Sequence, residues 1–142
     1  MEPQKTYTHD EAIAASLKYF NGDELAARVW VNKYAMKDSF GNIYEVSPED
    51  MHWRIANEIA RIENKYENPM SAQQIFELLD HFRYIIPAGS PMTGIGNKHQ
   101  IASLSNCFVI GLEGDADSYG AIMRIDEEQV QLMKRRGGVG HD

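Results

Sequence analysis

Cysteine is almost absent from this sequence, and its scarcity excludes several kinds of protein. Cys107 is the single cysteine, so no internal disulfide can form. No two histidines stand at a metal-ligand spacing on one predicted element, which argues against a zinc site. No run approaches the roughly 18 apolar residues of a membrane-spanning helix, and the first residues lack the apolar segment of a signal peptide. We therefore expect a cytoplasmic protein without membrane association.

Basic residues are also in short supply. The chain has 14 lysines and arginines against 21 aspartates and glutamates, and its net charge is -7. Non-specific binding to nucleic acid requires a basic surface, and the composition indicates none. We expect no direct nucleic-acid binding, although a small nucleotide remains a compatible ligand because it needs only local donors.

The sequence does contain enough apolar material for one folded core, since 43% of its 142 residues are hydrophobic and 25% are charged. Apolar residues at helical spacing and helix start signals predict four helices before residue 84. They cover about 9–20, 23–36, 48–66 and the segment after Ser71. Thr8 and Ser71 are expected caps, Ser71 in a capping box with Gln74, and Pro48 suits a first helical position.

The character of the chain changes near residue 84. An extended piece at 84–87 and a glycine-rich loop at 88–97 are expected before a strand at 103–111. An acidic loop at 113–117 and a helix ending at Gly137 and Gly138 follow. Along the strand, alternation places Ser103, Ser105, Cys107 and Val109 on one face and Leu104, Asn106, Phe108 and Ile110 on the other. The expected apolar face of the last helix contains Ile122, Ile125 or Asp126, Val130 and Met133.

Each chemical candidate in this region also has an ordinary structural explanation. Cys107 is either a small buried apolar residue or a reactive thiol, and its small, polar strand face suits a cavity wall. Asp117 and Ser118 either cap the last helix or bind a ribose or phosphate at its start. Helix termination explains the glycines at 137–140. His52 and His81 are expected at the surface or the edge of the core.

Four short motifs occur in one order along the chain. They are Ser-Pro at 90–91, Ser-Asn-Cys-Phe-Val-Ile at 105–110, Asp-Ser at 117–118 and Lys-Arg-Arg-Gly-Gly-Val-Gly-His-Asp at 134–142. Together they resemble the large, catalytic subunit of ribonucleotide reductase, over nearly the whole chain. The resemblance implies an α/β protein with an N-terminal helical domain at 1–83. The first strand-helix units of a ten-stranded α/β barrel, incomplete in this chain, would follow at 84–142.

The resemblance implies reduction of ribonucleoside diphosphates to deoxyribonucleotides for DNA synthesis by thiyl-radical chemistry. Cys107 would be one half of the redox-active cysteine pair. The implied substrate-binding residues are Ser90, Asn106, Cys107, Gly137 and Gly138, and no metal ligand is implied. Asp117 and Ser118 would begin the allosteric specificity site for a deoxynucleoside triphosphate effector. Asn106 stands where serine or alanine is commoner in the family.

The residues of the motifs are closer to those of the adenosylcobalamin-dependent type, which implies adenosylcobalamin as the radical source. The alternative is a di-metal radical supplied by a separate small subunit. The implied partners are a thioredoxin-like or glutaredoxin-like reductant, the remainder of the catalytic subunit and a second copy in a homodimer. The second reducing cysteine and the radical cysteine are missing, so this chain is expected to be an N-terminal portion that is inactive alone. The alternative function is a non-catalytic, nucleotide-binding remnant of the same fold.

Overall fold

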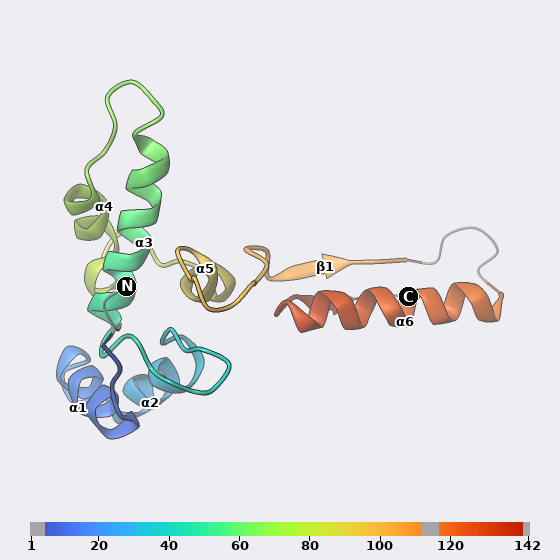
Figure 1. The fold of residues 1–142 in the computed structure, drawn as a ribbon, viewed down its shortest axis with the longest axis horizontal. Coiled ribbons are helices and arrows are strands. Elements are labelled where there is room, and N and C mark those ends of the chain that lie inside the picture. The colour runs from blue at the N-terminus through green and yellow to red at the C-terminus, as the bar shows by residue number, and fades with distance from the viewer. Residues whose placement is uncertain (1–4, 112–116, 141–142) are drawn as a thin grey trace.

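The computed structural model describes residues 5–111 and 117–140 as a helical body with a projecting arm (Figure 1). The body contains α1 (His9–Tyr19), α2 (Glu24–Lys33), α3 (Pro48–Glu63), α4 (Ala72–Leu79), the 3-10 turn η1 (Asp80–Phe82) and α5 (Gly89–Gly94). The arm contains β1 (Cys107–Val109), α6 (Tyr119–Lys134) and β2 (Gly138–Gly140). The expected acidic loop lies outside the described residues except for Asp117.

The helices of the body begin where the sequence predicts. Thr8 and Ser71 each accept a hydrogen bond from the third helical residue, in capping boxes completed by Glu11 and Gln74. Pro48 occupies the first turn of α3, where its missing N–H has no cost. The helices bury a common core of apolar side chains: Ala12, Trp30, Val31, Ala35, Ile43, Met51, Ile55, Ala56, Ala60, Ile75, Phe76 and Leu79. This core holds together the four helices that the periodicity predicts.

The segment expected as a loop at 88–97 contains a helix, so that prediction was wrong. α5 covers Gly89–Gly94 and has no side-chain cap, since Ala88 precedes it. Its stabilisation comes from another element: Arg54 of α3 donates hydrogen bonds to the carbonyl oxygens of Met92 and Ile95 at its C-terminal end. A tertiary contact therefore stabilises a helix that has no cap in its local sequence.

The arm is a strand-helix-strand unit, as the sequence predicts in outline. β1 pairs with β2 in parallel, with Cys107 opposite Gly138, and α6 forms the crossover. The predicted strand at 103–111 is too long, because only Cys107–Val109 is paired as a strand. Gly137 ends the helix as expected, through its N–H bond to the Leu132 carbonyl, whereas Gly138 begins β2.

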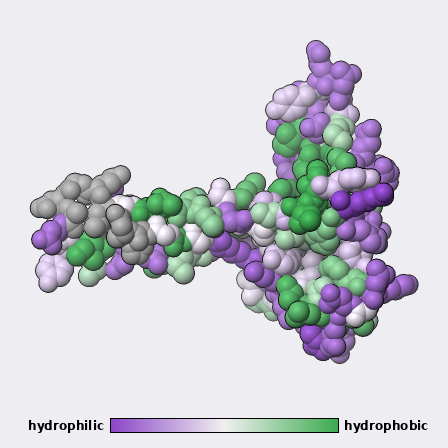
Figure 2. All heavy atoms as spheres, turned by 180° about the vertical axis from the view of Figure 1, so that it is seen from behind, coloured by the Kyte–Doolittle hydropathy of each residue, from purple (hydrophilic) through white to green (hydrophobic). Residues whose placement is uncertain are grey.

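α6 buries only part of the face that was expected. Ile125 is buried, whereas Ile122, Val130 and Met133 are 45%, 61% and 56% exposed. Figure 2 shows apolar atoms at the surface of the arm. None of the helices in the described ranges is long and apolar enough to cross a membrane.

Candidate functional site

A pocket of about 330 Å³ lies where the arm meets the body. Four separate parts of the chain contribute to it: the end of α2, the start of α5, the residue before β1 and the turn before β2. The lining residues are Lys33, Tyr34, Gly89, Ser90, Thr93, Asn106 and Arg136. Residues more than 100 positions apart in sequence therefore share one concave surface.

Ser90 and Asn106, both expected as substrate-binding residues, meet in this pocket. The backbone N–H of Ser90 donates a hydrogen bond of 2.9 Å to Oδ1 of Asn106. Ser90 is buried, and the Thr93 hydroxyl donates to the carbonyl oxygens of Gly89 and Ser90. The Asn106 side chain thus joins the arm to α5, which assigns it a structural role at the position where the family more often has serine or alanine.

Gly137 and Gly138 lie beside the pocket, and their missing side chains are required by packing. A Cβ on Gly137 would lie 2.8 Å from the ring of Phe108, closer than real Cβ atoms approach. The Gly138 N–H donates a 2.6 Å hydrogen bond to the Asn106 carbonyl, and a Cβ there would lie 3.2 Å from the same oxygen. These glycines let β2 lie against the segment that carries Asn106 and Cys107.

Cys107 begins β1 next to Asn106 but does not line this pocket. Its side chain is exposed, and strand alternation directs it away from the side chain of Asn106. The strand face that it shares with Ser105 and Val109 was expected to be a cavity wall. In the described residues this face is open, and Val109 is 92% exposed.

Two cationic side chains line the pocket, and neither was predicted to bind a ligand. Lys33 and Arg136 line it, and burial followed by the nearby charge of Arg136 lowers the pKa of Lys37. Within residues 5–111 and 117–140, neither Lys33 nor Arg136 forms an ion pair with a carboxylate. Unpaired cations beside a concave surface attract an anionic ligand.

The backbone at Arg136 has a left-handed conformation. Arg136 has a φ of 66°, and its N–H and that of Gly137 bond to the carbonyls of Met133 and Leu132 at the end of α6. This helix-ending motif normally places glycine at the left-handed position. An arginine there carries a strain of about 1 kcal/mol or more, and such strain is typical of binding sites.

Asp117 and Ser118 lie far from the pocket. They begin α6, at the end of the arm remote from the body in Figure 1. The Ser118 hydroxyl accepts a hydrogen bond from the Ala121 N–H, so Ser118 is the cap of α6, while Asp117 is exposed. The structure does not bring these two residues together with Ser90, Asn106 or Cys107.

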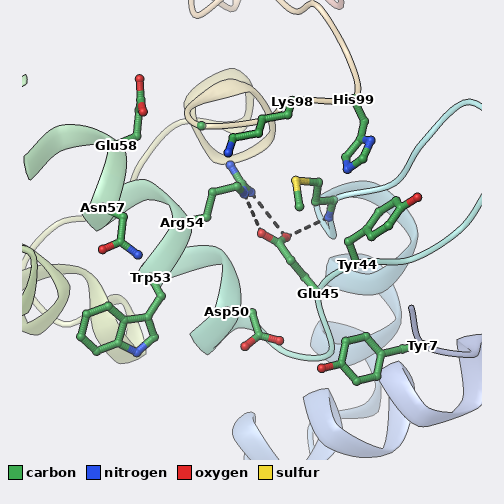
Figure 3. A pocket seen from close by; sticks show the side chains of 12 residues that line it. Tyr7, Tyr44, Glu45, Asp50, Trp53, Arg54, Asn57, Glu58, Lys98 and His99 are labelled. Atoms are coloured by element: carbon green, nitrogen blue, oxygen red, sulfur yellow. Dashed lines mark hydrogen bonds and ion pairs between the residues drawn. The ribbon is translucent and has the colours of Figure 1, made fainter. Parts of the chain in front are cut away.

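A second cavity, of about 740 Å³, opens on the body beside α3 (Figure 3). The carboxylate of Glu45 and the guanidinium of Arg54 form a buried ion pair at its floor. The rings of Tyr44 and His99 stack in parallel with centroids 4.2 Å apart. Sequence analysis singled out none of these four residues, which come together only through tertiary folding.

The chain matches one family model, described as the all-alpha domain of ribonucleotide reductase, over residues 20–100. The match covers more than half of the chain, runs through α5 and includes Lys33, Tyr34, Ser90 and Thr93 of the pocket. The chain therefore belongs to the ribonucleotide reductase family, and its helical body carries the all-alpha domain. No match was found among curated proteins or among solved structures.

Proposed function

We propose that this chain is the N-terminal portion of a ribonucleotide reductase catalytic subunit and that the pocket between body and arm binds the ribonucleotide. The observation that carries the proposal is the meeting of Ser90 and Asn106 with Lys33 and Arg136 around one cavity. Two residues that the family resemblance implies as substrate-binding converge there with two cations to which it assigns no role. Cationic donors suit phosphate oxygens, and small polar groups suit a ribose.

In the proposed reaction, the C2′ hydroxyl of the ribose leaves as water and hydrogen replaces it. Two cysteine thiols supply two electrons and two hydrogens and become a disulfide, so atoms and electrons balance. Cys107 is the proposed first thiol of that pair, and the second comes from a part of the catalytic subunit outside this chain. The Cys107 side chain must then face a sugar that reaches past Asn106 along β1.

The radical source stays part of the proposal, with adenosylcobalamin preferred over a di-metal centre on a separate small subunit. In the part of the chain that the structure describes, no three histidine, cysteine, aspartate or glutamate side chains are placed to hold a metal ion. The described residues therefore do not fit a resident metal, and we assign them no step through either cofactor. The reductant, the deoxynucleotide effector at Asp117 and Ser118, the homodimer and the cytoplasmic location belong to the same proposal.

Binding of ADP, GDP, CDP and UDP by isothermal titration tests the pocket. Lys33→Met and Arg136→Gly are each expected to weaken binding roughly tenfold or more, because each removes a charged hydrogen-bond donor. Arg136→Gly is the sharper variant, since glycine is preferred at a left-handed position and the fold should be at least as stable. Lys134→Met, which removes an exposed lysine two residues earlier, is the matched control.

Equal affinity of wild type, Lys33→Met and Arg136→Gly for every one of these nucleotides would contradict the assignment of the pocket. In the protein that contains the complete catalytic subunit, Cys107→Ser is expected to abolish multiple turnover with a dithiol reductant. Normal turnover by that variant would contradict the role of Cys107.

A further inference from the structure

A buried ion pair lies at the floor of the second cavity, outside the lining of the proposed nucleotide pocket. Nε of Arg54 is 2.6 Å from Oε1 of Glu45, and the two side chains are only 8% and 3% exposed. Figure 3 shows the two side chains facing each other between α3 and the segment before it. The family motifs include neither residue, so the pair has no role in the proposed function so far.

Both partners make further hydrogen bonds, and each bond reaches a different part of the chain. Oε2 of Glu45 accepts a 2.8 Å hydrogen bond from the backbone N–H of Met36, just beyond α2. The guanidinium of Arg54 donates to the Met92 carbonyl at 2.7 Å and also to the Ile95 carbonyl at the end of α5. One hydrogen-bonded unit therefore connects the end of α2 with the end of α5.

The two segments that this unit connects line two different sides of the pocket. Lys33 and Tyr34 come from the α2 side, and Gly89, Ser90 and Thr93 come from α5. The Tyr34 ring lies 3.5 Å from where a Cβ on Gly89 would stand, so the two sides are already in contact range. Any change in the length of the Glu45–Arg54 unit would move one side relative to the other.

Stability alone is a poor explanation for this pair. Removing two charges from water costs about as much as their attraction returns, and apolar replacements are often as stable. An arginine instead fixes the relative positions of its acceptors, because its planar guanidinium holds several of them at fixed angles. The Glu58–Arg61 pair near the surface of the same helix makes no comparable connections within residues 5–111 and 117–140.

We propose that Glu45 and Arg54 are positioning residues that set the separation of the α2 and α5 sides of the pocket. They do not line that pocket and act on it through the backbone at Met36, Met92 and Ile95. The identity of the ligand rests on the function proposed above, whereas the positioning of α5 does not.

Hydrogen exchange of single amides in the ligand-free protein tests the positioning directly. Arg54→Lys keeps the charge but loses the planar guanidinium, and Glu45→Gln keeps an acceptor for Met36 but loses the charge. In both variants we expect the Ser90 amide, which bonds to Asn106, to exchange roughly tenfold faster. Amides in the middle of α3 should keep their wild-type rates, and Arg61→Lys is the matched control.

Unchanged Ser90 exchange in both variants would overturn the inference, and so would a uniform acceleration of all amides that follows a lower melting temperature. Nucleotide titration is the second measurement: at a temperature where both proteins are folded, Arg54→Lys should bind ADP, GDP, CDP or UDP about tenfold more weakly than wild type. If wild type binds none of these nucleotides, the proposed function fails, while Ser90 exchange still decides the role of the pair.

Discussion

At the scale of single residues, His52 differs most from expectation. It was expected near the surface, but its ring is fully buried between α1, α3 and η1. Its Nδ1 lies 3.4 Å from the Tyr19 hydroxyl and 3.8 Å from Oδ1 of Asp80, and Phe82 packs edge-on against the ring. Burial lowers the pKa of His52 to about 4, although the nearby Asp80 carboxylate opposes that shift.

The lowered pKa of His52 predicts loss of stability in acid. The unfolded chain takes up a proton near the ordinary value of about 6.5, whereas the folded chain resists it until about 4. The contribution is therefore complete above about pH 6.5 and falls as the pH drops toward 4, by at most about 3 kcal/mol. Urea unfolding between pH 7.5 and 4.5 should show this fall.

His52→Gln should flatten the acid dependence, and the exposed His9→Gln is its control. A pH profile that is identical in wild type and His52→Gln would show that another group titrates. Asp80 and His81 face the same site. Burial acts to raise the pKa of Asp80, but hydrogen bonds from His81 and Tyr19 outweigh it, so the pKa is lowered.

Part of the site could be predicted from single residues, and part could not. Ser90 and Asn106 were found because their neighbours form motifs, and the structure joins them. Lys33 and Arg136 were not found, because a lysine or arginine near a helix end is usually explained by the helix dipole. Only the fold shows that they face a common cavity.

At the scale of secondary-structure elements, the signals for helix starts were the most reliable predictions from the sequence. The capping box of Ser71 with Gln74 gives α4 its first residue, and the structure contains both reciprocal hydrogen bonds. Ser71→Ala should therefore lower the free energy of unfolding by about 1 kcal/mol, as other caps do. Chemical denaturation measures this change.

The exposed Ser39→Ala, in a turn, is the control and should leave the free energy of unfolding within about 0.5 kcal/mol of wild type. A cap variant as stable as this control would mean that packing of Ile75, Phe76 and Leu79 alone determines the start of α4.

Elements that depend on distant partners could not be predicted. α5 has six residues, two of them glycine and one proline, and its terminal carbonyls are satisfied by Arg54 from another helix. β1 is shorter than its apolar pattern suggests, because only the stretch opposite Gly138–Gly140 finds a partner among the described residues. The apolar pattern of a segment indicates a preference for strand, whereas the length of the strand depends on how many residues of the neighbouring strand pair with it.

At the scale of the whole molecule, body and arm differ in how much they bury. The body has a continuous apolar core, whereas α6 has Ile125 as its one buried residue among those described. We therefore predict that amides of α6 exchange with solvent at least about tenfold faster than those in the middle of α3. Mass-spectrometric hydrogen exchange on peptides from the two helices would check this.

Equal protection of α6 and α3 in this chain would contradict that expectation and would indicate that the arm is covered in solution. The overall arrangement was predictable in outline, since four helices followed by a strand-helix unit is what composition and spacing indicate. The contact between the two parts was not, because the hydrogen bond between Asn106 and Ser90 joins segments whose sequences give no sign of it.

Asn106 is the point about which the arm would rotate relative to the body. Its side-chain oxygen is tied to Ser90 in the body and its main-chain oxygen to Gly138 in the arm. A helix as long as α6 spans about 24 Å, so a swing of about 10° would displace its far end by roughly 4 Å. The same swing would move the atoms at the pivot by a small fraction of that distance. If the arm turns as one rigid unit about Asn106, a movement at Ser118 would therefore reach Ser90 strongly reduced.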